Sequence, residues 1–124
     1  MASTAAFQPG PLMAVYYATK AYVLSFSEAV REELRETGVT VTTLCPGPTR
    51  TDFQKNAGIE RLRLLQITNM DARKVAALGY RGLMKGKRVV VTGFLNRFLA
   101  FGVRLMPRAF VAWVVRQVQV KTRL

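Results

Sequence analysis

The sequence predicts an α/β fold in which helices cover the faces of a parallel sheet. Three observations lead to this prediction: a long stretch with apolar residues at helical spacing, a short β-branched run directly after it, and a second helix-prone stretch that leads into the run KRVVVT. Parallel strands need such crossover connections between them. The alternation of helix and strand therefore indicates a layered domain with its helices on the faces of a sheet.

The first helix is predicted from about residue 14 to residue 37. Apolar residues recur there at steps of three and four, which is the spacing of one helical face; they are Tyr22, Phe26, Ala29, Val30 and Leu34. Gly38 suits the residue that ends a helix, because glycine adopts a positive φ without penalty. The run from Val39 to Cys45 then predicts a short buried strand.

The second helix and strand follow an irregular stretch from Pro46 to about Met70, part of which can be helical. Asp71 is a suitable cap for a helix that runs to about Met84, and residues 87–92 predict a second strand. Beyond Gly93, residues 96–121 are helix-prone, and Pro107 forces a break or the start of a new helix. We therefore divide the chain into a sheet-containing part, 1–93, and a basic helical extension, 94–124.

Composition excludes several kinds of site. The 124 residues are 50% hydrophobic, enough for one globular core, and they include one cysteine, Cys45, and no histidine. An intrachain disulfide is therefore impossible, and we predict no metal site, since the common zinc arrangements lack their ligands. Cys45 is expected to be a packed, inert thiol. With no secretory signal and no apolar stretch long enough to cross a bilayer, we expect a cytoplasmic protein, soluble or peripheral to a membrane.

The net charge of +12 lies entirely in the second half of the chain. Residues 1–57 hold five basic and five acidic groups, whereas the remainder holds fourteen basic groups against Glu60 and Asp71. Such asymmetry favours an anionic partner or surface near the C-terminal half. Nucleic acid is disfavoured as that partner, because no recognised nucleic-acid motif occurs.

A possible catalytic pair stands at the start of the first helix. Tyr16 and Lys20 are four residues apart and so share one helical face. An ammonium near a phenol favours the phenolate, and a nearby hydroxyl such as that of Ser3 could hold a substrate oxygen against the phenol. The spacing of tyrosine and lysine alone favours an ordinary solvated face. Ser3, thirteen residues before Tyr16, and Pro46-Gly47, thirty residues after it, favour a catalytic role instead.

Two stretches together resemble the catalytic region of the short-chain dehydrogenase/reductase family: ASTAAFQPGPLMAVYYATKAYVLSFSEAVREEL and GVTVTTLCPGPTRT. The resemblance implies a partial Rossmann-like, doubly wound parallel sheet, corresponding to the C-terminal half of the family's domain, with C-terminal helices after it. It also implies an NAD(P)-dependent oxidoreductase that interconverts a carbonyl and an alcohol on a small-molecule substrate.

The resemblance also implies roles for individual residues. Ser3 corresponds to the substrate-orienting serine, Tyr16 to the acid/base, and Lys20 to the lysine that favours the phenolate and binds the nicotinamide ribose. The residues implied to lie at the cofactor are Tyr16, Lys20, Pro46, Gly47, Thr49 and Thr51. Thr49 departs from the family pattern, since many members have valine or isoleucine there. The neighbouring Tyr17 has no lysine four residues later.

The family's glycine-rich turn, which seats the cofactor pyrophosphate, has no counterpart in the sequence. The residue that selects between NAD and NADP is also absent, so either cofactor is possible. Met1 leads directly into a small-residue stretch and a helix, which we interpret as a cut through a domain. We therefore expect a truncated chain that is inactive alone and that exposes an open sheet edge where the missing strands would pair. The resemblance also implies that the full-length form is a homo-oligomer, since the helix that carries Tyr22 and Phe26 forms a subunit interface in the family.

Two further stretches leave alternatives open. The apolar residues between Phe53 and Met70 favour an apolar substrate or a lid, or equally a surface helix packed on the sheet. The basic, aromatic stretch from Val103 to Arg123 favours packing on the core or a second subunit, with an anionic membrane surface as the alternative. The alternative function is thus a non-catalytic remnant that serves as an interaction or membrane-surface module through its basic C-terminus.

Overall fold

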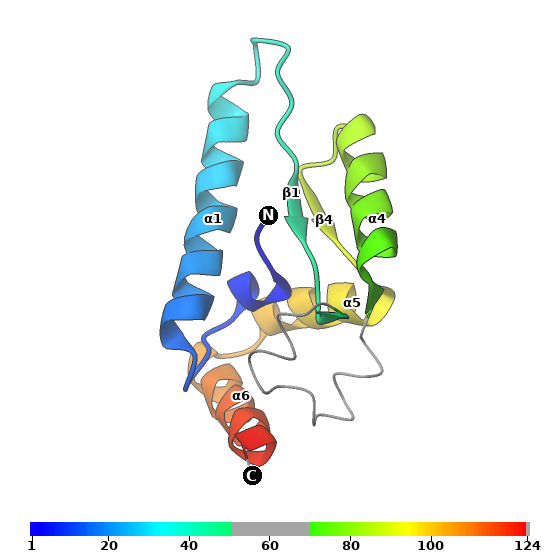
Figure 1. Cartoon of the computed structure of the whole chain (residues 1–124). Helices are drawn as coiled ribbons and strands as arrows, with labels where there is room; N and C mark the ends of the chain where they lie inside the picture. The colour runs from blue at the N-terminus through cyan, green and yellow to red at the C-terminus, as the bar shows by residue number, and fades with distance from the viewer. Residues whose placement is uncertain (51–69, 124) are drawn as a thin grey trace.

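The computed structural model describes residues 1–50 and 70–123 and is mixed α/β with a parallel sheet (Figure 1). In chain order the elements are η1 (Thr4–Phe7), α1 (Ala14–Glu33), β1 (Thr43–Cys45), β2 (Thr49–Arg50), β3 (Met70–Asp71), α4 (Ala72–Met84), β4 (Val89–Val91), α5 (Phe94–Gly102), η2 (Val103–Leu105) and α6 (Arg108–Arg123). The predicted order of helix, strand, helix and strand is confirmed.

The sheet is built on the parallel pair β1 and β4, in which Leu44 lies opposite Val90. The N-terminal residues extend this ladder on the other side of β1. The amide of Ala2 donates to the Leu44 carbonyl at 2.8 Å, and the amide of Thr4 donates to the Pro46 carbonyl at 3.0 Å. These bonds advance by two residues along both segments in the same direction, which is the pattern of a parallel ladder. Three parallel runs therefore lie side by side.

Helices α1 and α4 lie on opposite faces of this sheet, as Figure 1 shows. On one face Leu24 of α1 packs in a buried cluster with Cys45, and Val89 and Val91 lie against it. On the other face the glycines of α4 allow close approach: a β-carbon on Gly82 would stand 2.2 Å from Val90 Cγ2. Because alternate strand residues point to opposite faces, the odd-numbered residues of β4 meet α1 and Val90 meets α4.

The boundaries of the first helix and strand differ from the prediction. Helix α1 ends at Glu33, and a turn leads to Gly38, whose φ is +77°. The run from Val39 to Thr42 precedes the paired strand, which begins only at Thr43. A strand needs a partner as well as β propensity, and the hydrogen-bonded partner β4 spans only three residues.

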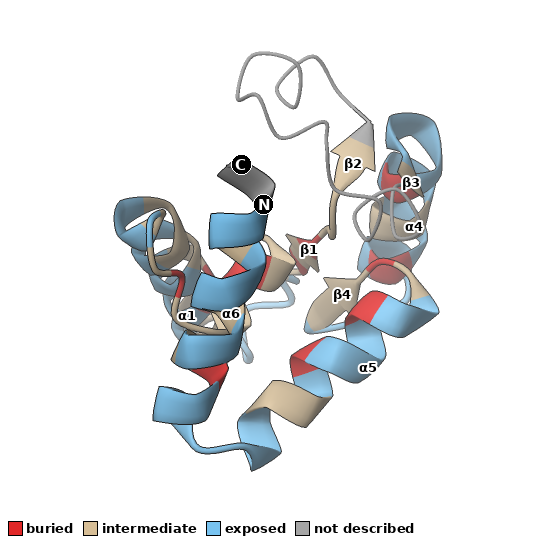
Figure 2. Cartoon of the chain, turned by 90° about the horizontal axis from the view of Figure 1, so that it is seen from below, coloured by how far each residue is buried: buried red, intermediate tan, exposed pale blue. Residues whose placement is uncertain are grey.

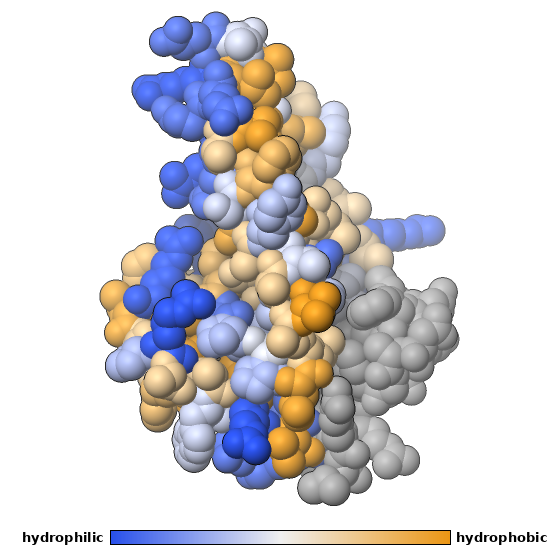
Figure 3. All heavy atoms as spheres, turned by 90° about the vertical axis from the view of Figure 1, so that its left-hand side faces the viewer, coloured by the Kyte–Doolittle hydropathy of each residue, from blue (hydrophilic) through white to orange (hydrophobic). Residues whose placement is uncertain are grey.

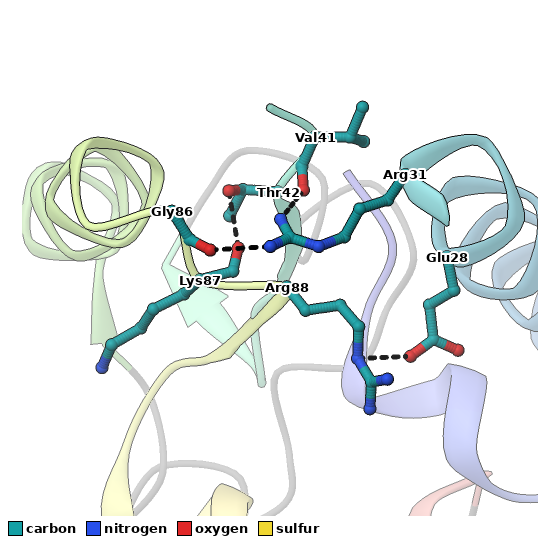
Figure 4. Close-up of polar contacts among 7 residues, drawn as sticks. All are labelled: Glu28, Arg31, Val41, Thr42, Gly86, Lys87 and Arg88. Atoms are coloured by element: carbon teal, nitrogen blue, oxygen red, sulfur yellow. Dashed lines mark hydrogen bonds and ion pairs between the residues drawn. The ribbon is translucent and has the colours of Figure 1, made fainter. Parts of the chain in front are cut away.

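A set of side-chain contacts joins the C-terminal part of α1 to the segments that precede β1 and β4 (Figure 4). The Arg31 guanidinium donates to the Val41 carbonyl at 2.7 Å and to the Gly86 carbonyl at 3.0 Å. The Thr42 hydroxyl donates to the Lys87 carbonyl at 2.7 Å, and Arg88 pairs with Glu28 of α1 at 3.4 Å. Arg31 thereby fixes the two segments that lead into β1 and β4.

The later helices follow the predicted signals closely. The Asp71 carboxylate accepts the Arg73 amide at 2.7 Å and so caps α4. Pro107 separates η2 from α6, whose first turn is closed by the Val111 amide donating to the Pro107 carbonyl. Within residues 1–50 and 70–123, no helix has the length and apolar character needed to cross a membrane.

Candidate active site

Ser3 lies at the carboxyl end of the N-terminal run, beside the segment that follows β1. Its hydroxyl accepts the Ala5 amide at 3.2 Å and so caps η1, and it donates to the Pro46 carbonyl in a long bond of 3.5 Å. The carboxyl ends of parallel strands meet at one edge of a sheet, which is where ligands bind in open α/β folds. The structure thus brings two sequence-predicted site residues, Ser3 and Pro46, into contact.

A tight turn directly precedes α1 and so sets the position of Tyr16 in the first turn of that helix. The Met13 amide donates to the Gly10 carbonyl at 3.1 Å, and Leu12 between them adopts a φ of +68°, a left-handed conformation that is uncommon for a residue with a side chain. Gly10 is buried against the ring of Tyr17, so closely that a β-carbon there would stand 2.1 Å from the ring. The turn is therefore anchored to α1 by Tyr17.

Lys20 lies over the ring of Tyr16. Its Nζ atom is 5.6 Å from the centroid of the Tyr16 ring, within the range of a cation–π contact. In the described part of the chain no carboxylate pairs with this ammonium and no hydrogen bond uses its donors. Lys20 can therefore donate hydrogen bonds to a ligand while it stays beside the phenol ring. The helical spacing of four residues, recognised in the sequence, produces this arrangement.

Tyr17 differs from Tyr16 in both its contacts and its environment. Gln119 of α6 donates to the Tyr17 hydroxyl at 3.3 Å. Burial raises the pKa of Tyr17, and hydrogen bonds from Gln119 and Gln8 oppose that rise only in part. A partly buried phenol whose pKa is raised is a poor proton relay near neutral pH. Of the two adjacent tyrosines, the geometry therefore favours Tyr16 for acid/base chemistry.

The Pro46-Gly47 turn packs against a residue that sequence reasoning missed. Asn96, buried on α5, lies so close to Gly47 that a β-carbon on the glycine would stand 2.1 Å from Asn96 Nδ2. That amide donates to the Thr92 carbonyl at 2.9 Å. The sequence carries no clear signal for this contact, because Asn96 is one of two polar residues, with Arg97, in a helix that is apolar elsewhere. The contact between Asn96 and Gly47 holds α5 against the Pro46-Gly47 turn.

Of the remaining predicted residues, Thr49 lies on β2, whose partner is β3, and its hydroxyl donates to the Gly47 carbonyl at 3.0 Å. Thr51 lies outside the described residues, as does most of the predicted apolar stretch from Phe53 to Met70. Another hydroxyl lies near the turn: Thr92 follows β4, is buried, and its Oγ1 has no hydrogen-bond partner among the described residues.

The predicted site thus falls into two groups. Ser3, Gly47 and Thr49 gather around the Pro46 turn, whereas Tyr16 and Lys20 stand together on α1, against which η1 packs. Within residues 1–50 and 70–123, no hydrogen bond joins Ser3 to Tyr16. A hydroxyl, a phenol and an ammonium of this kind can orient a substrate oxygen and transfer a proton to or from it.

Comparison with known proteins connects these residues to a family. The family model described as short chain dehydrogenase matches residues 1–62. An uncharacterized oxidoreductase of Staphylococcus epidermidis is 33% identical over 78 residues, which cover 63% of this chain and 34% of that protein. The uncharacterized oxidoreductase YghA of Escherichia coli is 38% identical over 56 residues, which cover 45% of this chain and 19% of that protein.

A solved structure supports the same relation. A short-chain dehydrogenase from Sphingobium yanoikuyae, in complex with NADPH, superposes with a TM-score of 0.66 and 29% sequence identity. The superposition covers 84% of this chain and 41% of that protein. The chain therefore spans well under two thirds of the length of the relatives it matches.

Proposed function

Because the chain belongs to the short-chain dehydrogenase family, we propose that it supplies the proton-transfer half of an oxidoreductase site that interconverts a carbonyl and an alcohol. The observation that carries the proposal is the position of the Lys20 ammonium, 5.6 Å from the centroid of the Tyr16 ring, with its donors unused in the described part of the chain. The contact between Ser3 and the Pro46 turn supports it.

The cofactor proposed for the site is a nicotinamide dinucleotide, NAD or NADP. When bound, such a cofactor supplies or accepts the hydride. The described side chains fit its nicotinamide and ribose end, since the donors of Lys20, unused within the described part of the chain, suit ribose hydroxyls. Pro46, Gly47, Thr49 and Thr51 are proposed to line the nicotinamide. Tyr16 would contact the same end. None of the described residues forms a glycine-rich turn that fits a pyrophosphate.

The roles of the three catalytic candidates follow from their chemistry. The Ser3 hydroxyl donates a hydrogen bond to the substrate oxygen and holds it toward the phenol. Tyr16 gives its proton to that oxygen during reduction and takes one from it during oxidation. The Lys20 ammonium stabilises the negative charge on the phenolate that reduction leaves behind. The substrate is proposed to be a small apolar carbonyl or alcohol compound.

The proposal also covers the activity of the chain alone and the oligomeric state of the active form. We expect this chain alone to be inactive, because its residues fit only one end of the cofactor. A homo-oligomer is proposed for the active form. The rings of Tyr22 and Phe26 stack with their centroids 5.9 Å apart on the outer face of α1, and the two residues are 67% and 56% exposed. Figure 3 shows hydrophobic residues along this side of the molecule, with hydrophilic residues beside them at the upper end. Such an exposed apolar band suits contact with a second subunit.

The second candidate function is a non-catalytic module that acts through its basic C-terminal residues. The observation in its favour is the charge distribution, with fourteen basic groups against two acidic ones beyond residue 57. The two candidates are separated by placing the chain behind a glycine-rich, nucleotide-binding half and measuring the oxidation of NADH or NADPH by carbonyl compounds. We expect Ser3→Ala to lower the rate on the order of a hundredfold. A rate that is zero in every such fusion, although the fusion binds the cofactor, would favour the module.

A further inference from the structure

Helix α5 turns its most apolar face outward. Phe94, Phe98 and Phe101 are 88%, 68% and 65% exposed. They recur at helical spacing and share one face, whereas Asn96 and Ala100 form the buried face on the opposite side. Figure 2 shows the buried positions of α5 turned toward the interior and its outer side exposed. A surface helix normally exposes polar residues, so this arrangement indicates a partner that is itself apolar.

A basic groove adjoins the start of this helix. A hollow of about 420 Å³ lies between α4, β4 and the first turn of α5, with an apolar lining that includes Leu78 and Val90. Four cationic side chains surround it: Arg81, Lys85, Lys87 and Arg97. Phe94 also lines the hollow, so the groove and the exposed face of α5 form one continuous surface. We refer to this surface, made of these cations and Phe94, Phe98 and Phe101, as the α5 surface.

The charge around the α5 surface is unbalanced. No acidic residue occurs anywhere from residue 72 to residue 124. Among the described residues none of the four cations forms an ion pair, and the nearest acid in sequence, Asp71, is engaged as the cap of α4. A second copy of this chain, docked through the same surface, would bring like charges together at a cost in free energy. The charge is complementary to an anionic partner instead.

We propose that the α5 surface docks on an anionic membrane, with the phenylalanines in the boundary between headgroups and acyl chains and the four cations at the lipid phosphates. Apolar side chains flanked by lysine and arginine are the features that hold a helix in the plane of a membrane interface. Each such cation gains energy from an anionic leaflet. Nucleic acid offers the same negative charge but no hydrocarbon in which to bury a phenylalanine face.

The membrane proposal goes beyond the oxidoreductase proposal and does not depend on it. It also differs from the sequence-based alternative, which assigned membrane contact to residues 103–123. In the structure, the outward phenylalanine face and the surrounding cations belong to α4, the turn between α4 and β4, and α5, and therefore begin before that stretch.

Co-sedimentation of the full chain with lipid vesicles tests the proposal. We expect binding to vesicles that contain about 30% phosphatidylserine, little binding to vesicles of phosphatidylcholine alone, and a loss on the order of tenfold when salt rises from about 0.1 M to about 1 M. Phe98→Asp should weaken binding to the anionic vesicles about tenfold or more, because the apolar contact is replaced by a repelled charge.

The matched control is Val39→Asp, which makes the same change in charge at an exposed position in the segment between α1 and β1. That segment lies at the upper end of the molecule in Figure 1, whereas α5 lies toward the lower end. It should bind as the unmodified chain does, and circular dichroism should show both variants folded. Equal binding to both kinds of vesicle, no binding to either, or unchanged binding by folded Phe98→Asp would each overturn the proposal. The same holds if Phe98→Asp keeps full affinity for vesicles and duplex DNA alike, since that result identifies a general polyanion surface.

Discussion

Asn96 of α5 lies directly against Gly47, the second residue of the turn that follows β1. A β-carbon on Gly47 would stand 2.1 Å from the Asn96 amide nitrogen and 2.6 Å from its carbonyl carbon, Cγ. The amide nitrogen is fixed in turn by its bond to the Thr92 carbonyl. The position of the candidate cofactor turn is thus set by a residue from the C-terminal helices.

This contact predicts that Gly47→Ala destabilises the fold. The added methyl group must displace a buried, hydrogen-bonded side chain, which we expect to cost about 1–3 kcal/mol. Urea unfolding measures the change. Gly102→Ala is the matched control, because nothing lies within 4 Å of a β-carbon there and its φ is negative. The control should be neutral or slightly stabilising, and equal losses in both variants would contradict the account of the contact.

Arg31 of α1 is predicted to contribute more to stability than the nearby Arg35. Arg31→Met removes two hydrogen bonds, to the Val41 and Gly86 carbonyls, and we expect it to lower the free energy of unfolding by about 2 kcal/mol. Arg35, in the turn directly after α1, provides the comparison. It pairs with Glu32 between side chains that are 76% and 72% exposed, so Arg35→Met should cost about 0.5 kcal/mol or less. Thermal unfolding of the two variants measures the difference.

Cys45 is predicted to be unreactive in the folded protein. It is fully buried, and burial raises the pKa of its thiol from 9.0 to about 11. A disulfide reagent at about pH 8 should therefore label it only as fast as the chain unfolds, because the thiolate is the attacking species. Rapid labelling of the native chain, with no lag, is the result that would rule out a buried thiol.

The raised pKa of Cys45 also predicts how stability changes with pH. Between about pH 9 and about pH 11 the unfolded chain loses the thiol proton while the folded chain keeps it, so the unfolded state is favoured. Stability from Cys45 is fully present below about pH 9 and is lost as the pH rises through this window. A Cys45→Ala variant should show a shallower fall over the same window, even though Tyr17, whose pKa is also raised, contributes a fall of the same sign in both proteins.

Local patterns predicted the parts of the fold that depend on neighbours in sequence. The Asp71 cap, the break at Pro107 and the meeting of Tyr16 with Lys20 all follow from residues within about one helical turn of each other. The spacing of side chains along a helix is regular, so such contacts can be predicted before any tertiary structure is known.

The parts of the fold and of the candidate site that were not predicted depend on contacts between segments far apart in the sequence. The bond from Ser3 to Pro46 requires the N-terminal run to join β1, and the contact of Asn96 with Gly47 requires α5 to pass beneath the turn. Neither has a local signature. The pairing of β2 with β3 was likewise missed, because two-residue strands carry no periodicity. Helix α1 was predicted too long because the charged residues after Glu33 have ordinary helix propensity and only the turn to Gly38 ends it.

The most direct test of the central claim compares two adjacent tyrosines. With the chain placed behind a glycine-rich, nucleotide-binding half, the rate of carbonyl reduction is measured for Tyr16→Phe and for Tyr17→Phe, which remove the same hydroxyl one position apart. We expect Tyr16→Phe to lower the rate a hundredfold or more, at the scale of general acid catalysis, and Tyr17→Phe to keep most of it, since that hydroxyl is bonded to Gln119. Full activity in Tyr16→Phe would contradict the claim that this residue transfers the proton.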